Sequence, residues 1–397
     1  MKTILAISII VALGSCSRSE DPFWTIEHQD GVDIRRYHSV DPPRIDPCEP
    51  GEVTVFGHDQ SADTYFLRYA VPLLVLPDGN LLISGGENES GLIHRFSSEG
   101  YYLSSFGRMG EGPGEIRTGA HVVFLLGDTI AVPDKANKRI SHFDLSGRYL
   151  GLVTMPAEIA GHANPEIIPL SRSRFILVSL DGRGLSQTDA GTVFRWRYLI
   201  QELGRDLLPI DTAVDTLMDH VWKVVGNKYL FSPMGRTAPV SSVAAPGLPV
   251  AWIERDIYRV EFLDLTTRRR YAVELPYPQE PITAEIRRRF VDAHVDMDYS
   301  REGLNRLQLP AHLPAIDVLR WDDQGRLWVR DYVNEYAETE AETFYFNVFS
   351  REGEWLFRQQ LDRTPDLIQG GALYFSDEDD EGNPLVIRQQ LKESESR

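Results

Sequence analysis

The sequence has few of the residue groupings that usually mark a metal centre or a nucleophilic active site. Its ten histidines are scattered, with no His-x-His, His-Glu-x-x-His or Cys-x-x-Cys spacing, so no motif assigns a metal site. A Gly-x-Ser-x-Gly nucleophile elbow is also missing. Only two cysteines are present, Cys16 and Cys48. Cys48 lies in a proline-rich segment without an obvious catalytic partner, which disfavours a catalytic thiol.

Positive charge is scarce as well. Lysine and arginine together number 41 against 59 aspartates and glutamates, which gives a formal net charge of −18. This balance argues against nucleic acid or an anionic membrane surface as the main partner. Long apolar runs are missing after the N-terminus, and the apolar stretch at residues 4–13 is too short to span a bilayer.

Residues 1–16 have the order of features of an export signal. Lys2 supplies the positive start, residues 4–13 the apolar centre, and the segment ends in Leu-Gly-Ser-Cys at residues 13–16. This ending resembles a bacterial lipobox, in which the cysteine becomes the lipidated first residue. The lipobox predicts lipidation at Cys16, with several acyl chains for stable anchoring, and leaves Cys48 without a disulfide partner. An ordinary secretory signal cut near Ser15 is the alternative.

What is present is the composition of a large folded domain, with 42% hydrophobic and 10% aromatic residues in 397. Its most distinctive stretch, residues 106–116, holds four glycines and a proline between two strand-like runs. Glycine permits tight turns and close backbone approach. A phosphate-binding P-loop would need Lys-Ser/Thr and then a helix, and a dinucleotide-binding loop would also need a helix. Because residues 121–126 favour a strand instead, phosphate binding is disfavoured.

Two segments carry a resemblance to a known family. Residues 132–144 resemble the V-x-D-x-x-N-x-R-I-x-x-F-D signature of NHL-repeat β-propellers. Residues 106–115 resemble the F-G-x-x-G-x-G-x-G linker that joins one NHL blade to the next. With the lipobox, the chain resembles the bacterial six-bladed β-propeller lipoproteins. The resemblance implies a closed ring of sheets, and structural roles for Asp134, Asn137 and Arg139.

From residue 51 onward, strand–turn–strand pairs recur along the chain. They predict five full blades, at residues 65–106, 119–155, 165–210, 220–276 and 315–362. Strand-like pieces at residues 53–57 and 371–391 are predicted to share a further blade, which would close the ring without exposed edges. We therefore predict an all-β, six-bladed propeller over residues 51–391, with seven blades as the alternative. Residues 17–50 are predicted to be a tether and extended lead-in, and residues 392–397 a tail.

Residues 283–294 interrupt the strand pattern. Thr283 is suited to cap a helix, and Ile286 and Phe290 lie one helical turn apart. With prolines on both sides, the segment predicts one helical insertion between blades four and five. We interpret the three consecutive arginines at 287–289 as a solvated face, with anion binding as the alternative.

The topology of a four-stranded antiparallel blade predicts where a binding site would lie. Loops between second and third strands share one side of the ring, the loop face, with the connections between blades. Long and charged insertions fall on this side, the usual arrangement of a binding surface on a rigid scaffold. The predicted insertions are residues 85–91, 108–115, 181–191, 234–255, 331–343 and 376–384. The candidate ligand-binding residues there are Arg108, Glu111, Glu115, Asp134, Lys138, Asp181, Arg183, Arg236 and Asp331.

Carboxylates directly after second strands offer one route to a metal. Propeller lactonases and amidating lyases assemble metal sites near the axis from separate blades. The residues similarly placed here are Glu87, Asp134, Asp181 and Asp331. A calcium or similar divalent ion on the axis is therefore the alternative to a protein without a cofactor. The acidic run at residues 377–381 lacks the spacing of an EF-hand loop, and we interpret it as a solvated tip.

These features predict a lipid-anchored propeller on the cell envelope, in the outer membrane of a Gram-negative bacterium. It would bind a protein, peptide or glycan through the loop face, and no nucleic acid. A metal-dependent hydrolase or lyase, lactonase-like or amidating-lyase-like, is one alternative function. A structural component of an envelope complex is the other.

Overall fold

The computed structural model of the protein describes residues 23–393 apart from 59–66, 86–92, 118–121, 161–162, 172, 182–184, 189–190, 221–222, 226–227, 231–240, 243–246, 255–256, 297–299, 306–308 and 338–342. Cys16 and the export signal lie outside the described residues. Within the described ranges, no helix has both the length and the apolar character needed to cross a membrane.

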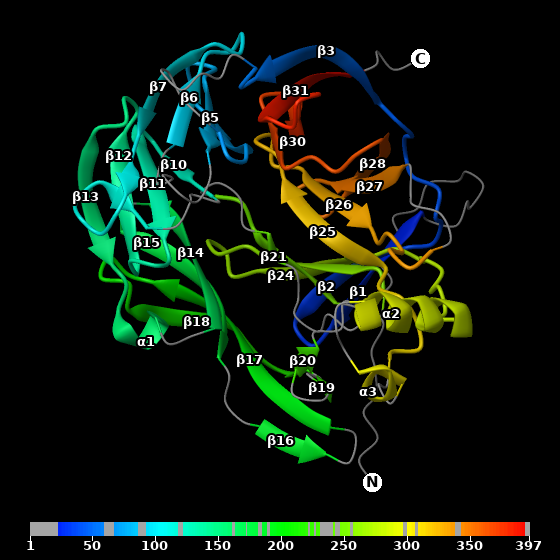
Figure 1. The fold of residues 1–397 in the computed structure, drawn as a ribbon. Coiled ribbons are helices and arrows are strands. Elements are labelled where there is room, and N and C mark those ends of the chain that lie inside the picture. Colours follow the sequence, from blue (N-terminus) through cyan, green and yellow to red (C-terminus); the bar gives the residue numbers. More distant parts are fainter. Residues whose placement is uncertain are drawn as a thin grey trace, which may run out of the picture.

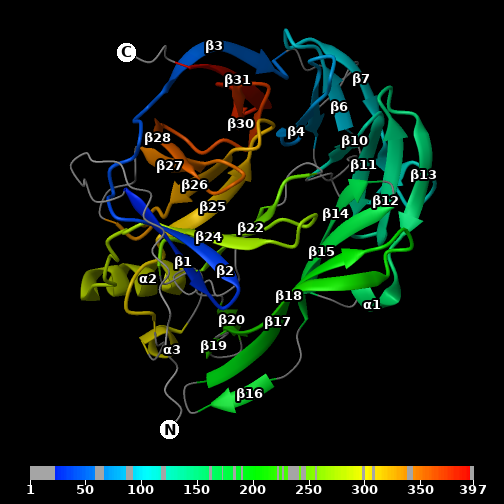
Figure 2. The same cartoon turned by 180° about the vertical axis from the view of Figure 1, so that it is seen from behind.

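Six sheets of at least four strands form a ring, which confirms the six-bladed propeller rather than a seven-bladed one (Figures 1 and 2). Blade one contains β4 (Val71–Val75), β5 (Leu81–Ser84), β6 (Ile93–Phe96) and β7 (Tyr102–Phe106). Blade two contains β10 (Phe124–Leu126), β11 (Thr129–Asp134), β12 (Arg139–Asp144) and β13 (Tyr149–Thr154). Blade three contains β14 (Ala163–Ser171), β15 (Arg174–Asp181), β17 (Gly191–Leu203) and β18 (Pro209–His220), with β16 (Leu185–Thr188) paired to the start of β17.

The other three blades complete the ring. Blade four contains β21 (Ser241–Ser242), β22 (Val250–Glu254), β23 (Arg259–Leu263) and β24 (Arg270–Glu274). Blade five contains β25 (Ile316–Trp321), β26 (Leu327–Asp331), β27 (Phe344–Phe349) and β28 (Trp355–Leu361). Blade six contains β29 (Leu367–Gln369), β30 (Ala372–Glu378), β31 (Pro384–Glu393) and β3 (Cys48–Phe56).

The hydrophobic core is divided among the six blade interfaces. Each blade is a sheet with two faces, and each face packs its apolar side chains against the next blade. Between blades one and two, for example, Leu82 and Phe106 pack with Ile130 and Phe143. Comparable clusters join blades two and three, three and four, four and five, five and six, and six and one. The ring therefore depends on every interface being closed.

The two ends of the chain close the ring, as the sequence predicts. β3, near the N-terminus, pairs antiparallel with the C-terminal strand β31, with Val55 opposite Ile387. Phe56 of β3 packs with Phe96 of blade one, while Cys48 of the same strand packs against blade five. The last blade is thus held to both of its neighbours by the first strand of the ring.

The segment before β3 contributes more than the predicted lead-in. β1 (Trp24–Gln29) and β2 (Val32–Tyr37) form a hairpin, and β2 continues the sheet of blade four by pairing parallel with β24. Ile45 then bridges to Arg358 at the outer edge of blade five. This part of the chain consequently runs along the outer edges of blades four, five and six (Figure 1).

Blade four differs from the prediction. The hairpin expected as its inner pair, around residues 226–227, is a separate two-stranded sheet of β19 (Lys223–Val225) and β20 (Lys228–Leu230). The inner strands are β21 and β22, inside the segment 234–255 that was predicted to be a loop. The sequence of residues 234–249 is rich in proline, glycine, alanine and serine, which favours a loop. The buried run Val-Ala-Trp-Ile of β22 was therefore not predicted to be a strand.

The helical insertion between blades four and five is confirmed. It contains α2 (Ala284–Asp296) and α3 (Arg301–Asn305), and a one-turn α1 (Ala157–Ala160) lies elsewhere, after blade two. The Thr283 hydroxyl accepts the amide of Ile286 at 3.2 Å, as an N-cap does. Arg288 pairs with Glu285 and Asp292 on the exposed side of α2, which agrees with a solvated face.

Glycine turns hold neighbouring blades together, and one of them gives a sharp stability test. Gly100 has φ +96°, and a Cβ there would overlap the carbonyl oxygen of Val55 in β3. Gly127 has φ +66° with nothing within 4 Å of a Cβ. We expect Gly127→Ala to cost about 1 kcal/mol of unfolding free energy from backbone strain alone. Gly100→Ala should cost about 2 kcal/mol more, because it also overpacks the closing interface. Urea unfolding measures both, and equal losses would contradict this packing.

Candidate binding site on the loop face

The glycine-rich connection from blade one to blade two is fixed by a buried arginine. The connection contains β8 (Arg108–Met109) and β9 (Glu115–Ile116), which pair in parallel. Arg139, only 7% exposed, donates from Nη1 to the carbonyl of Glu111 at 2.7 Å. Its Nη2 donates to the carbonyls of Gly112 at 3.0 Å and Glu115 at 2.7 Å. One guanidinium therefore binds three carbonyls of the loop.

Asp134 and Asn137 complete this arrangement. The fully buried Asp134 carboxylate accepts the Asn137 side-chain amide at 2.7 Å and the Arg117 backbone amide at 3.2 Å. The same Asn137 amide donates to the carbonyl of Gly110 at 2.8 Å. Residues of β11 and β12 thus form hydrogen bonds to the loop that precedes them. Residues 106–117 and 132–144 together make one structural unit, which we call the glycine-rich unit.

The outer side of this loop displays charged tips on a fixed backbone. Glu115 accepts the Gly112 amide at 2.7 Å and Arg108 Nε at 2.8 Å, and the Gly112 hydrogen bond is the main cause of its lowered pKa. The Arg108 side chain is 77% exposed and that of Glu111 72% exposed. Lys138 is exposed too, at a left-handed turn position with φ +52°. These side chains can contact a ligand, while the conformation of the loop is fixed by Arg139.

A second polar cluster lies between blades four and five. Asp331, at the end of β26, is 5% exposed. Its carboxylate accepts Asn347 Nδ2 at 2.8 Å, Arg358 Nη2 at 2.6 Å and the Tyr277 hydroxyl at 3.3 Å. Asn347 also donates to the Tyr258 hydroxyl at 2.8 Å. Burial raises the pKa of Asp331 to about 6, although Arg358 opposes the shift. A carboxyl group that titrates near neutral pH marks a candidate functional position.

A cavity of about 450 Å³ opens beside this cluster. Tyr258 and Tyr277 belong to both the cluster and the cavity wall, and the N-terminal hairpin supplies Tyr37 and Arg36. Arg36 is already paired with Glu274 at 2.7 Å. The cavity therefore has an aromatic lining with a neutralised charge pair at its edge.

The raised pKa of Asp331 predicts a pH-dependent stability. Because the folded-state pKa, about 6, exceeds the ordinary 3.8, the folded protein holds this proton more tightly than the unfolded chain. The resulting stabilisation is fully present below pH 3.8 and is lost as the pH rises through about 6. Relative to Asp331→Asn, the wild-type unfolding free energy should fall by about 2–3 kcal/mol between about pH 4 and pH 7. Urea unfolding across this range tests the prediction, and a constant difference between the proteins would contradict it.

The insertions on the loop face gather over blades three to five. α2 and α3 share a small core in which Ile286, Phe290 and Leu304 pack against Tyr336 of the β26–β27 loop. α3 also contacts β19, and β19 contacts β17, the long strand that projects from the ring (Figure 1). We call α2, α3, β16, β19, β20 and the projecting part of β17 and β18 the insertion cluster.

The predicted site residues fall into separate groups. Arg108, Glu111, Glu115, Asp134 and Lys138 meet in the glycine-rich unit, whereas Asp331 lies in the cluster of blade five. Asp181 ends β15 opposite Arg197 in the strand register. The other three predicted positions, Glu87, Arg183 and Arg236, lie outside the described residues.

The metal prediction stays open. Asp134 and Asp331 are each held by an arginine or an amide rather than by further acids. Among the described residues, no three His, Cys, Asp or Glu side chains are grouped closely enough to hold a metal ion. Because the side chains of Glu87 and Asp181 are not among those described, the axial calcium site remains a prediction.

Sequence reasoning missed the partners of Asp331. Asn347 stands alone among apolar residues in the strand Phe-Tyr-Phe-Asn-Val-Phe, and such a buried amide needs a polar partner. That signal could have pointed to Asn347. Tyr258, Tyr277 and Arg358 come from other strands and connections, so no local pattern indicates them.

Comparisons with known proteins show a similar fold but no family for this chain. No protein-family model matches it, and no curated protein matches it. A Bacteroides fragilis protein provisionally described as exported is similar in structure, with 10% identity, a TM-score of 0.48, and coverage of 90% of this chain and 99% of the other. A member of the DUF4221 family from Bacteroides vulgatus has 9% identity and a TM-score of 0.48, covering 87% and 98%.

A more distant likeness is to a streptogramin B lyase, with 9% identity, a TM-score of 0.37, and coverage of 86% of this chain and 98% of the lyase. These identities and scores are too low to transfer an activity or a ligand. The fold follows from the sheet topology of this chain itself.

Proposed function

We propose that the chain is an exported lipoprotein, anchored through Cys16 in the outer membrane of a Gram-negative bacterium. There it acts as a binding module whose loop face takes a protein, peptide or glycan. The single observation that supports this function is the difference between the two faces of the ring. One face has compact turns such as residues 97–101 and 350–354. The other carries the insertion cluster and the glycine-rich loop.

The chemistry of the loop face suits recognition of a polar partner. Charged tips such as Arg108 and Glu111 stand on a backbone that is fixed from below by Arg139, so little ordering entropy is lost on binding. Aromatic residues line the cavity beside the Asp331 cluster, between blades four and five of the same face. Arginine and aromatic side chains are both enriched at protein interfaces.

Anchoring is tested by Cys16→Ser. We expect this variant to leave the membrane fraction and to remain a folded, soluble domain, because the ring does not depend on residue 16. Cell fractionation with immunoblotting measures the distribution, and circular dichroism of the purified variant checks its fold. A variant that stays in the membrane pellet would contradict the anchor.

Binding is tested by capture from detergent-solubilised native envelope. The wild-type protein is compared with the double variant Arg108→Ala/Glu111→Ala and with Arg148→Ala, whose side chain is 77% exposed on the opposite face. A partner retained by wild type and Arg148→Ala, but lost by the double variant, supports the loop face. Stoichiometric divalent metal in the same preparation would favour the metal-dependent hydrolase or lyase instead.

A further inference from the structure

One turn in the ring lacks a glycine contact with the preceding blade that three other blades share. In blades one, two and five, a five-residue turn joins the third and fourth strands, and its fourth residue is a glycine with positive φ. That glycine lies against the preceding blade. A Cβ on Gly147 would come within 2.6 Å of Phe106, and one on Gly353 within 2.9 Å of Val273.

Blade three has a leucine at this position. Its turn, residues 204–208, keeps the same hydrogen bonds, with the Gly204 amide donating to the Leu208 carbonyl at 2.9 Å. Leu207 occupies the left-handed position with φ +59°. Its side chain is completely buried in the core between blades two and three. A buried side chain therefore stands at the position where three other turns place a glycine against the preceding blade.

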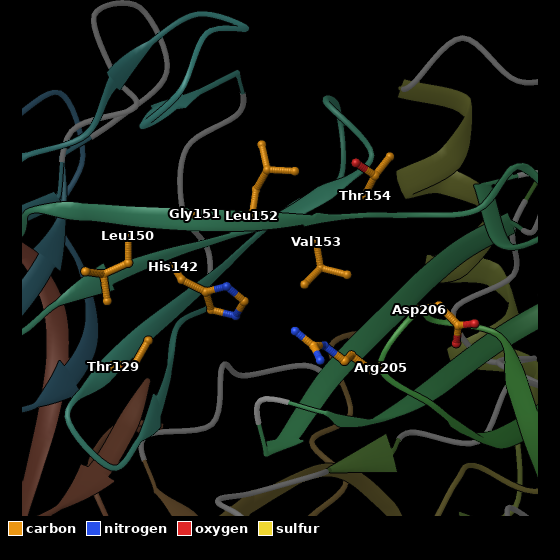
Figure 3. A pocket seen from close by; sticks show the side chains of 9 residues that line it. All are labelled: Thr129, His142, Leu150, Gly151, Leu152, Val153, Thr154, Arg205 and Asp206. Atoms are coloured by element: carbon orange, nitrogen blue, oxygen red, sulfur yellow. The ribbon is translucent and has the colours of Figure 1, made fainter.

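The strand that faces this turn, β13, has a glycine without close neighbours at the same place. Gly151 of β13 lies opposite His142 of β12, and a Cβ on Gly151 would meet nothing within 4 Å. A cavity of about 600 Å³ results (Figure 3). It is lined by Thr129, His142, Leu150, Gly151, Leu152, Val153, Thr154, Arg205 and Asp206.

The cavity combines a cation with an aliphatic wall. Arg205 is exposed, and no ion pair of its guanidinium occurs in the described part of the chain. In Figure 3 this guanidinium and the imidazole of His142 point toward one another across the cavity. Leu150, which is 49% exposed, and Val153 supply apolar surface on the side of β13 that faces the guanidinium, whereas Leu152 points away from it (Figure 3). A guanidinium is a planar fork of donors that matches the oxygens of a carboxylate or phosphate.

We propose that this cavity is a second binding site, for a small organic anion with a short aliphatic part. The anionic group is bound by Arg205, with His142 across the cavity from it, and the aliphatic part lies on Leu150 and Val153. Arg205 and Asp206 lie in the turn from β17 to β18, on the face opposite the loop face, and the other lining residues lie on β11, β12 and β13. None of them is among the loop-face residues described above, so this site is independent of the binding function proposed for the loop face.

The test is calorimetric titration of the purified full-length protein with four probes: hexanoate, hexyl phosphate, the neutral hexanamide, and inorganic phosphate. We expect at least one of the two hexyl anions to bind. Hexanamide and inorganic phosphate should each bind about tenfold more weakly or worse, because each lacks one half of the recognised chemistry. Which hexyl anion binds identifies the anionic group. No binding of either, or equal binding of hexanamide, would overturn the proposal.

Two matched variants locate the binding in the cavity. Arg205→Gln should weaken the hexyl anion about tenfold or more, since it removes the charge and leaves a shorter, neutral side chain that still carries N–H donors. Arg351→Gln is the control, because Arg351 holds the same second position of the turn in blade five, where glycine contact closes the interface. It should leave affinity unchanged. Leu150→Ser should weaken the hexyl anions while sparing inorganic phosphate. Equal affinities of wild type and Arg205→Gln, with both folded by circular dichroism, would contradict this site.

Discussion

A chain that ends at residue 370 should fail to fold. This truncation removes β30 and β31, so β3 loses its partner and the ring cannot close. Blade six would keep only β29 and β3, which do not pair with each other. The interfaces with blades five and one would lose Leu373, Tyr374 and Val386, all buried. Since buried apolar side chains each stabilise by about 1.5–3 kcal/mol, these three alone contribute about 5–9 kcal/mol, which is comparable with the whole stability of an ordinary domain.

Circular dichroism and limited proteolysis of the purified proteins measure this effect. The matched control is deletion of residues 17–22, which shortens the predicted tether. Phe23 is kept in the control because its ring lies 5.3 Å from that of Tyr37. The control should unfold at the wild-type temperature. Equal unfolding temperatures for the two deletions would show that the C-terminal strands do not close the ring.

Arg139→Ala should be the most damaging single substitution in the glycine-rich unit. The change leaves the carbonyls of Glu111, Gly112 and Glu115 without their charged donor and Asp134 without a neighbouring cation. Hydrogen bonds to charged groups contribute about 1.5–3 kcal/mol each, and we expect a total loss of about 3–4 kcal/mol because such terms are not additive. Hydrogen exchange should also show faster exchange of the Gly112 amide.

Two further arginine variants distinguish this role from a general effect of charge. Arg108→Ala should change the unfolding free energy by less than about 0.5 kcal/mol, because the side chain is largely exposed. Arg139→Lys keeps the charge without the planar fork, so most of the loss should remain. If Arg139→Lys matched the wild type, charge alone would suffice and the three-carbonyl geometry would be irrelevant.

The parts of the fold that could be predicted from the sequence are those with a local signal. The signature at residues 132–144 and the glycine-rich loop are each one continuous run of residues, so the sequence alone indicates both. The helical insertion is predicted by the capping residue Thr283 and by the spacing of Ile286 and Phe290. Ring closure followed from strand-like pieces left unpaired at both ends, since exposed sheet edges are unfavourable.

The parts that could not be predicted depend on contacts between distant strands. Parallel pairing of β2 with β24 joins residues that are 238 positions apart, such as Arg36 and Glu274. No turn connects the two strands directly, so no local sequence signal indicates this pairing. The Asp331 cluster draws side chains from several strands and connections. The cavity beside Arg205 lies next to a turn in which Leu207 holds the position of a glycine in three other blades. This equivalence becomes clear only when the turns of different blades are compared.

The central claim, that the loop face is the binding surface, is tested most directly by site-specific photo-crosslinking in living cells. A photoreactive residue is placed at Arg108 or Arg288 on the loop face, and at Ser146 or Glu352 in exposed turns of the opposite face. We predict that the loop-face positions yield a discrete crosslinked partner and that the other two do not. Crosslinks confined to positions 146 and 352 would contradict the claim.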